Sequence, residues 1–329
     1  MDRNKNLRIA LPSSGNLYEP ALGFLKASGL NVSRINSRRY TATIPSMENL
    51  EVIFQRVSDI TQTIEDGRAD IGIVGKDMFS EYRLDATRCE VLIDGLGFAH
   101  SKMVLGVPDS WIDVVSITDL ADVASEFRNE GQELRVATKY PRLTERFLLK
   151  KGVNYFSLVF SRGSLEVAPA MGSADVIADI TETGVTMREN RIKTISGGTI
   201  ISSQAILICN RGVLNSGDEK QHLTESITEL MESYLKSKGS YSVTANIKGK
   251  NADEVAQRVL SDVKISGLRG PTISRVFSNT NDDWFAVTVV VDQSELLKVV
   301  ASFRALDGES VTVSQPDYVF TSQNDSPDS

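Results

Sequence analysis

One stretch, residues 175–190, constrains this chain more than any other. It opens with a short apolar strand at residues 176–180 and continues into a threonine-rich turn that contains Gly184. A glycine lets the backbone approach a ligand closely, and consecutive N–H groups in such a turn point at an anion. The stretch therefore predicts a strand that ends in a phosphate-binding turn. An ordinary turn between a strand and a helix fits the spacing about equally well.

Two kinds of side chain in this stretch suit different parts of a ribose phosphate. The hydroxyls of Thr181, Thr183 and Thr186 can donate hydrogen bonds to a phosphate, whereas the carboxylate of Asp179 would repel one. A carboxylate can instead accept hydrogen bonds from neighbouring sugar hydroxyls. An acid followed by a hydroxyl-rich turn therefore predicts a ribose-phosphate site.

The segment Asp179-Ile-Thr-Glu-Thr-Gly-Val-Thr-Met-Arg-Glu-Asn190 resembles the phosphoribosyl-diphosphate loop of ATP phosphoribosyltransferases, the first enzymes of histidine biosynthesis. Residues 56–60, 70–77, 135–141 and 163–169 resemble other segments of that family, and the resemblance extends over about residues 7–318. It implies the long form of the enzyme, with a two-lobed α/β catalytic part of periplasmic-binding-protein-like (type II) architecture.

Short apolar strands alternate with helical segments along the first two thirds of the chain, which is the pattern of an α/β fold. Polar residues collect after the strands, where such folds bind their ligands. We expect residues 1–95 and 188–222 to form lobe I and residues 96–187 to form lobe II. A strand at residues 203–210 would return the chain to lobe I.

Composition excludes several other classes of protein. A net charge of −7 argues against a nucleic-acid surface, which needs a basic face. Cys89 and Cys209 make neither a disulfide framework nor a metal spacing and are expected to be buried thiols. No apolar run approaches the ~20 residues of a membrane span, and no signal peptide is recognised. We therefore expect a cytoplasmic protein that contacts neither membrane nor nucleic acid.

The resemblance implies roles for individual residues of the catalytic part. The catalytic residues would be Asp179, Glu166 and Arg56. The substrate-binding residues would be Thr181, Glu182, Thr183, Gly184, Val185, Thr186, Thr138, Tyr140, Gly15 and Asp77. Tyr140 could stack on a base, and packing against the following helix is an equally good reading of it.

The first loop departs from the family. Many members carry a lysine and an arginine where this chain has Ser13 and Asn16. Those cations would face the phosphates of a substrate. Other basic residues could replace them, and the candidates are Arg38, Arg39, Arg56 and Lys76.

The last third of the chain changes pattern. An amphipathic helix begins near residue 223 and stops at Gly239, and strands and helices then follow in the order βαββαβ. That order predicts a ferredoxin-like, ACT-like domain, which could serve as a sensor or as an oligomerisation domain. We assign residues 223–321 to the linker helix and this domain, and expect the polar tail at 322–329 to be disordered.

The resemblance also implies what the C-terminal domain binds. In the long form of the family this domain binds histidine as a feedback inhibitor. The matching positions are Asn246, Leu268, Thr272 and Ser310. The family also suggests dimers that assemble into hexamers.

The implied reaction joins ATP to phosphoribosyl diphosphate and releases pyrophosphate. The attacking adenine nitrogen already carries its lone pair, so the reaction requires no strong general base, and the sequence shows no catalytic dyad. Mg²⁺ would be held mainly by the pyrophosphate, because the sequence has no side-chain metal motif. The alternative is a non-catalytic cytoplasmic sensor of small molecules on the same fold.

Overall fold

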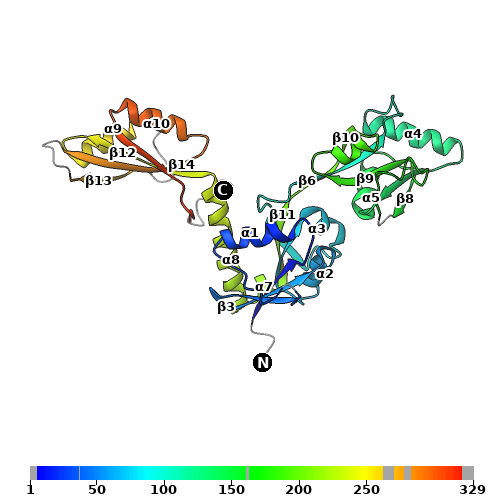
Figure 1. Cartoon of the computed structure of the whole chain (residues 1–329), viewed down its shortest axis with the longest axis horizontal. Coiled ribbons are helices and arrows are strands. Elements are labelled where there is room, and N and C mark those ends of the chain that lie inside the picture. The colour runs from blue at the N-terminus through cyan, green and yellow to red at the C-terminus, as the bar shows by residue number, and fades with distance from the viewer. Residues whose placement is uncertain (1–5, 37, 161–162, 262–269, 278–282, 321–329) are drawn as a thin grey trace. The chain divides into compact units, whose positions relative to one another are not determined.

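The computed structural model describes residues 6–36, 38–160, 163–261, 270–277 and 283–320. Leu268 and the tail expected to be disordered lie outside these residues. The chain forms two compact units that divide between Glu225 and Ser226, inside helix α8 (Glu219–Lys238) (Figure 1). The first unit contains two α/β lobes, and the second is the C-terminal domain.

Lobe I is built on a six-stranded mixed sheet in the order β2-β3-β1-β4-β11-β5. The strands are β1 (Leu7–Pro12), β2 (Thr41–Ile44), β3 (Met47–Gln55), β4 (Ile71–Gly75), β5 (Cys89–Ile93) and β11 (Ala205–Asn210). The helices are α1 (Tyr18–Ala27), α2 (Val57–Glu65), α3 (Lys76–Tyr82) and α7 (Arg211–Leu214). Every residue of β4 is buried, which fits a central strand covered on both faces.

Lobe II is built on a five-stranded mixed sheet in the order β10-β6-β9-β7-β8. The strands are β6 (Ser101–Pro108), β7 (Leu134–Thr138), β8 (Phe156–Phe160), β9 (Val176–Thr181) and β10 (Ile192–Ser203). The helices are α4 (Ile117–Asn129), α5 (Pro141–Lys150) and α6 (Val185–Glu189). Ser116 and Asp119 have the spacing of a capping box in the sequence, and Ser116 caps α4 with Asp119 as the reciprocal partner.

The two lobes share one topology. In lobe I the parallel strands β3, β1 and β4 lie side by side, and the antiparallel β11 follows β4. In lobe II the parallel strands β8, β7 and β9 lie side by side, and the antiparallel β6 follows β9. The chain enters lobe II from lobe I on β6, and it returns to lobe I from lobe II on β11. In each lobe this antiparallel strand lies next to the third parallel strand. This is the periplasmic-binding-protein-like arrangement, as expected.

The same main-chain joint fixes the first and third strands of both lobes. The carboxylate of Asp70, before β4, accepts a hydrogen bond from the N–H of Arg8 in β1 at 2.7 Å. The carboxylate of Asp175, before β9, accepts one from the N–H of Arg135 in β7 at 2.8 Å. Each acid also donates its own N–H to the carbonyl of the same arginine. Two separate parts of the chain therefore build the same local structure.

Two details of lobe I differ from the prediction. Residue 188 was expected to begin the return to lobe I, but β10 pairs with β6 in the sheet of lobe II, so the return comes only at β11. Residues 196–199 are all small or polar and lie where the register of β10 with β6 shifts, which hides this long edge strand in the sequence. The hairpin of β2 and β3 was also not predicted.

The C-terminal domain has a four-stranded antiparallel sheet in the order β13-β14-β12-β15, with two helices on one face (Figure 1). Its elements are β12 (Ser240–Lys248), α9 (Ala252–Leu260), β13 (Thr272–Val276), β14 (Trp284–Asp292), α10 (Leu296–Ala305) and β15 (Glu309–Ser314). Alternate residues of β12 and β14 pack against the helices in one apolar core. The predicted ferredoxin-like order is confirmed.

No helix in the described part of the chain is long and apolar enough to cross a membrane. Cys89 and Cys209 are both buried and unpaired, as expected. Burial raises the pKa of each thiol to about 12, so neither is a reactive thiolate at neutral pH. The cytoplasmic location stays a prediction.

Candidate active site

The residues predicted to form the site lie at the carboxyl ends of the parallel strands in both lobes. In lobe I, Gly15 follows β1, Arg56 follows β3 and Asp77 follows β4. In lobe II, Thr138 ends β7 and Tyr140 follows it. Glu166 follows β8, and residues 179–186 span the end of β9, the turn beyond it and the start of α6. Ligands of open α/β sheets bind at these strand ends.

The turn between β9 and α6 has the geometry of an anion cradle. Gly184 has φ +73° and ψ 7°, a left-handed conformation that side chains other than glycine adopt at a cost. Its N–H donates to the hydroxyl oxygen of Thr181 at 2.7 Å, which closes the turn. Thr183, Val185 and Thr186 are exposed, and the first N–H groups of a helix have no partner within it. Hydroxyl and amide donors therefore remain available at this turn.

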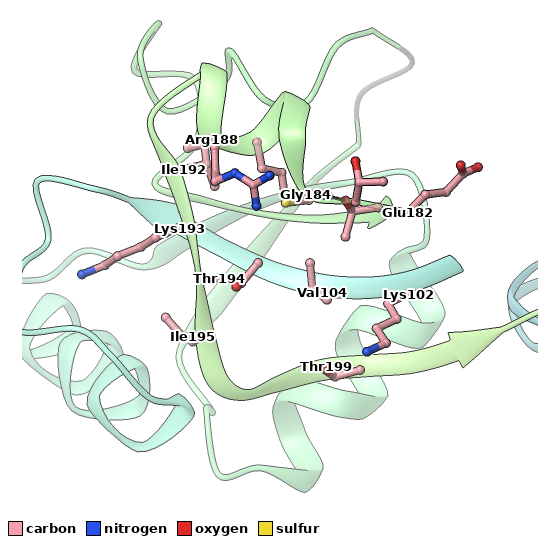
Figure 2. A pocket seen from close by; sticks show the side chains of 13 residues that line it. Lys102, Val104, Glu182, Gly184, Arg188, Ile192, Lys193, Thr194, Ile195 and Thr199 are labelled. Carbon is pink, nitrogen blue, oxygen red and sulfur yellow. Dashed lines mark hydrogen bonds between the residues drawn. The ribbon is translucent and has the colours of Figure 1, made fainter. Parts of the chain in front are cut away.

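A pocket of about 450 Å³ opens beside this turn (Figure 2). Its lining includes Lys102 at the start of β6 and Arg188 in α6. Neither the Lys102 nor the Arg188 side chain forms an ion pair or a hydrogen bond with a described residue. Lys193 also lines the pocket, but its ammonium donates to the main-chain oxygen of Trp111 at 2.6 Å. Figure 2 shows Lys193 and the carboxylate of Glu182 directed away from Arg188.

Lys102 and Arg188 are the site residues that sequence reasoning missed. Arg188 stands four residues after Gly184, so on a helix it lies over the turn that precedes it. A β-carbon built on Gly184 would lie 3.3 Å from a guanidinium nitrogen of Arg188. That spacing was a usable signal. Lys102 had none, because only the pairing of Lys102 with Thr181 in the sheet brings it to the turn.

Asp179 is buried and poorly solvated. Its side chain accepts a hydrogen bond from the N–H of Ile180 at 2.8 Å, and 8% of the residue is exposed. Burial raises the pKa of its carboxyl above the ordinary value. The Ile180 N–H and the charge of Lys139 lower that pKa, and the charge of Glu166 raises it. An acid with so few donors around it has oxygen atoms left to accept hydrogen bonds from a ligand.

Asp77 is equally buried but fully engaged. The Ser203 hydroxyl donates to one of its carboxylate oxygens at 2.5 Å, and the Tyr140 hydroxyl donates to the other at 3.3 Å. Its own N–H donates to Ser203 at 3.0 Å. Burial raises the pKa of the Tyr140 phenol, and the charges of Asp77 and Asp179 raise it further. Tyr140 therefore stands close to both acids.

Thr138 and Tyr140 are held by the protein itself. Thr138 is fully buried, and its hydroxyl lies 3.1 Å from that of Thr144 and accepts from the N–H of Tyr140. Tyr140 is 9% exposed. Of the two readings of Tyr140, this arrangement fits packing between strand and helix. Their contact with substrate stays a prediction.

The cations considered as replacements in lobe I differ in availability. Lys76 pairs with Asp94 at 2.6 Å, whereas Arg56 is exposed and has no partner among the described residues. Another arginine of lobe I, Arg34, has its guanidinium 4.0 Å above the ring of Phe54 and donates a hydrogen bond to the Tyr18 hydroxyl. Lobe I thus presents an arginine and aromatic rings near the end of β3.

The residues predicted to bind an effector do not all lie together. Asn246 in β12 pairs with Glu309, beside Ser310, whose φ of 52° marks an irregularity in β15. Thr272 lies in β13 at the opposite edge of the sheet. β13 lies three strand spacings from β15 and two from β12, so Thr272 is roughly 14 Å from Ser310 and roughly 10 Å from Asn246. One chain therefore brings Asn246 and Ser310 together, but not Thr272.

Within the described residues, no group of three or more His, Cys, Asp or Glu side chains could hold a metal ion. At the strand ends of lobe II the carboxylate donors are Asp179, Glu166 and Glu182. Oxygen donors suit a hard cation such as Mg²⁺, but these supply at most a partial shell. They fit a divalent ion that arrives bound to the phosphates of a substrate.

Comparison with known proteins gives one consistent family. Residues 56–233, more than half of the chain, match the ATP phosphoribosyltransferase family, and residues 237–315 match the C-terminal domain of that family. The chain is similar to ATP phosphoribosyltransferase 1, chloroplastic, of Arabidopsis thaliana, with 37% identity over 95% of this chain and 77% of the relative. It is also similar to ATP phosphoribosyltransferase of Rhodopseudomonas palustris, with 33% identity over 96% of this chain and 94% of the relative.

A solved structure agrees with these relatives. The ATP phosphoribosyl transferase (HisG:HisZ) complex from Thermotoga maritima aligns with a TM-score of 0.51 at 26% identity, over 69% of this chain and 98% of that one. No finding supports the alternative of a non-catalytic sensor. By its sequence, its two lobes and its C-terminal domain, the chain belongs to the ATP phosphoribosyltransferase family, whose members catalyse the first step of histidine biosynthesis.

Proposed function

We propose that lobe II holds phosphoribosyl diphosphate, with Asp179 on the ribose hydroxyls and the turn after β9 on the 5-phosphate. The observation that supports this assignment is the contrast between Asp179 and the turn after β9. Asp179 is buried with one donor, and the neighbouring turn exposes hydroxyl and amide donors. A ribose would satisfy the oxygens of Asp179, and a phosphate would satisfy the donors of the turn.

Lys102 and Arg188 supply the positive charge beside the turn. Both line the pocket, and neither is engaged by another described residue. Arginine matches a phosphate with a bidentate fork, and lysine acts as a point charge. Arg56 and Gly15 lie at strand ends of lobe I and are assigned to the ATP side of the reaction. Glu166 acts on Asp179 through its charge.

The reaction forms a bond between an adenine nitrogen of ATP and the anomeric carbon of the ribose. The bond from that carbon to pyrophosphate oxygen breaks, and the electron pair leaves with the pyrophosphate. Positive charge develops on the ribose ring, and the carboxylate of Asp179 lies where it can stabilise that charge while it orients the ring. The attacking nitrogen needs no deprotonation, so no side chain is assigned as a general base.

Members of this family use a divalent metal ion, and we assign Mg²⁺ to this chain. The carboxylates at the strand ends of lobe II would complete the shell of an ion that is bound mainly by the pyrophosphate. Such an ion neutralises charge on the leaving group. The role of Asp179 in orienting the ribose does not depend on coordination of this metal ion.

The C-terminal domain is assigned to L-histidine as feedback inhibitor, with Asn246 and Ser310 on one side of its site. Thr272 lies at the other edge of the same sheet, so a site that uses all three needs a second copy of the chain. This supports a homo-oligomer built from dimers, with a hexamer as the expected assembly.

Pyrophosphate release from ATP and phosphoribosyl diphosphate, with Mg²⁺, tests the assignment. Release should require both substrates and fall when L-histidine is added. Release that ignores histidine would remove the effector assignment and leave the catalytic one. No release by folded protein would overturn the assignment of lobe II.

A matched pair of variants tests the two cations. Lys102→Gln combined with Arg188→Gln should raise the KM for phosphoribosyl diphosphate by about 100-fold or more, since each charged hydrogen bond contributes a net stabilisation of roughly 1.5–3 kcal/mol. Lys193→Gln is the control, because Lys193 lines the same pocket but is bound to main-chain oxygen. An equal rise in KM for the control would refute the assignment.

A further inference from the structure

A second pocket, of about 320 Å³, lies between α3 and α5 and shares no lining residue with the pocket beside Gly184. Three of its lining residues are arginines: Arg83, which follows α3 of lobe I, and Arg142 and Arg146, in the first half of α5 of lobe II. No acidic side chain is among the described residues that line it. This concentration of positive charge stands out on a chain whose net charge is −7.

The three guanidinium groups keep much of their hydrogen-bonding capacity free. Arg142 uses only its Nη1, which donates to the main-chain oxygens of Glu81 at 2.9 Å and of Arg83 at 3.0 Å. Arg83 lies over the ring of Phe79, at 5.2 Å from its centroid, and donates no hydrogen bond from its side chain to a described residue. Arg146 has no partner in the described part of the chain. Each arginine therefore has donors left for a ligand.

The surrounding structure fixes the start of α5, which carries Arg142. The buried carboxylate of Glu81 accepts hydrogen bonds from the N–H groups of Arg142 at 3.0 Å and of Leu143 at 2.8 Å. Glu81 thereby caps the first turn of α5 from α3 of the other lobe. The two hydrogen bonds hold this carboxylate at the start of α5, and its single negative charge offsets only part of the positive charge of the three guanidinium groups.

Beyond the one charge of Glu81, the positive charge of the three arginines is uncompensated by the residues that line the pocket. Arg142 and Arg146 stand four residues apart on one face of α5, a spacing at which like charges repel. Arg83 adds a third positive charge from the facing element. An oxyanion bound among them would relieve the repulsion and form charge-assisted hydrogen bonds.

We propose that this pocket binds a phosphoryl group, as inorganic phosphate or as a phosphate monoester, at a site separate from the catalytic one. Arg83 belongs to lobe I and the other two arginines belong to lobe II, so a bound phosphoryl group ties α3 to α5. The site gives the enzyme a means of sensing phosphate through the junction of its lobes.

The test measures thermal stabilisation by inorganic phosphate, by glycerol 3-phosphate and by glycerol, at constant ionic strength. It uses the Lys102→Gln/Arg188→Gln protein, in which the cations of the first pocket are removed. Inorganic phosphate well above its Kd should raise Tm by about 3 °C, because a ligand of the native state stabilises it. A larger rise with glycerol 3-phosphate identifies a monoester as the preferred source, and an equal rise identifies free phosphate. Glycerol alone should give none.

Adding Arg83→Gln and Arg146→Gln to that background should abolish the rise. Adding Lys26→Gln and Arg304→Gln instead should preserve it, because these two exposed cations carry the same charge but lie outside the pocket. Arg146→Gln alone changes an exposed residue and should weaken phosphate binding about tenfold in an otherwise stable protein. A rise that survives Arg83→Gln/Arg146→Gln, or that is missing from the starting background, would overturn the proposal. The catalytic assignment is independent of either result.

Discussion

The two lobes of the catalytic part place one buried aspartate each at the carboxyl end of their third parallel strand, and the two aspartates have opposite surroundings. Asp77, after β4, accepts hydrogen bonds from Ser203 and Tyr140. Asp179, in β9, accepts one from the neighbouring N–H of Ile180. The topology around them is the same. The difference shows that one fold can use the carboxyl end of its third parallel strand to join its lobes in one half and to meet a ligand in the other.

The contrast also separates stability from function. A buried carboxylate that is well supplied with donors holds a structure together, whereas one with few donors costs stability until a ligand completes its shell. Asp179 belongs to the second class, and burial raises the pKa of its carboxyl. Perturbed pKa values of this kind cluster at functional sites.

The largest expected effect is on catalysis at Asp179. Asp179→Asn should lower kcat/KM about 100-fold, since a charged hydrogen bond to the ribose contributes roughly 3 kcal/mol to binding in the transition state. Asp77→Asn should lower it less than tenfold, because Asp77 is engaged by the protein. Steady-state pyrophosphate release measures both, and equal losses in the two variants would break the comparison.

Gly184→Ala should raise the KM for phosphoribosyl diphosphate about tenfold and lower stability by about 1 kcal/mol, because φ is +73° there. Gly131→Ala is the control: Gly131 has φ +75° and open space around its α-carbon, and it lies outside the pocket. The control should show the stability cost without the change in KM. A raised KM in both would make the effect one of strain alone.

The joint between Asp77, Ser203 and Tyr140 should carry stability. Tyr140→Phe removes one hydrogen bond to a buried carboxylate, and chemical denaturation should show a loss of about 1–2 kcal/mol. Tyr155→Phe, at an exposed tyrosine of lobe II, should lose less than about 0.5 kcal/mol. A stable Tyr140→Phe protein with impaired binding of ATP would restore Tyr140 to the substrate site.

The smallest predicted effect is a difference in stability between the joint at Asp70 in lobe I and the joint at Asp175 in lobe II. Lys220 pairs with Asp70 in lobe I with side-chain exposures of 18% and 9%, whereas Arg135 pairs with Asp175 in lobe II at 42% and 16%. Lys220→Gln should therefore cost about 1–2 kcal/mol, and Arg135→Gln less than about 1 kcal/mol. Denaturant titration of the two variants measures both losses in the free energy of unfolding. A larger loss for Arg135→Gln would contradict this ranking.

The sequence predicted more of the fold than of the site. Short apolar strands and the cap at Ser116 are local features, and the structure contains both. The long edge strand β10 was assigned to the wrong lobe, because pairing between distant segments decides where an edge strand lies. Local patterning carries no such information.

The same limit applies to the site. The turn after β9 was predicted from its residues because threonine and glycine act locally. Lys102 was missed because sheet pairing places it there. Packing of Tyr140 within the protein was one of its two readings, but its hydrogen bond to Asp77 could not be foreseen, since Asp77 lies far away in the sequence.

The most direct test of the contrast between the two acids is the thermal stability of Asp179→Asn and Asp77→Asn as a function of pH. The raised pKa of Asp179 means that the native state retains its proton where the unfolded chain has lost it, so the wild type loses stability as pH rises through that range. Above it, Asp179→Asn should melt about 2–4 °C higher than wild type, and Asp77→Asn should melt lower. If Asp179→Asn melts lower than wild type at neutral pH, Asp179 is a structural acid and the assignment of the ribose site is wrong.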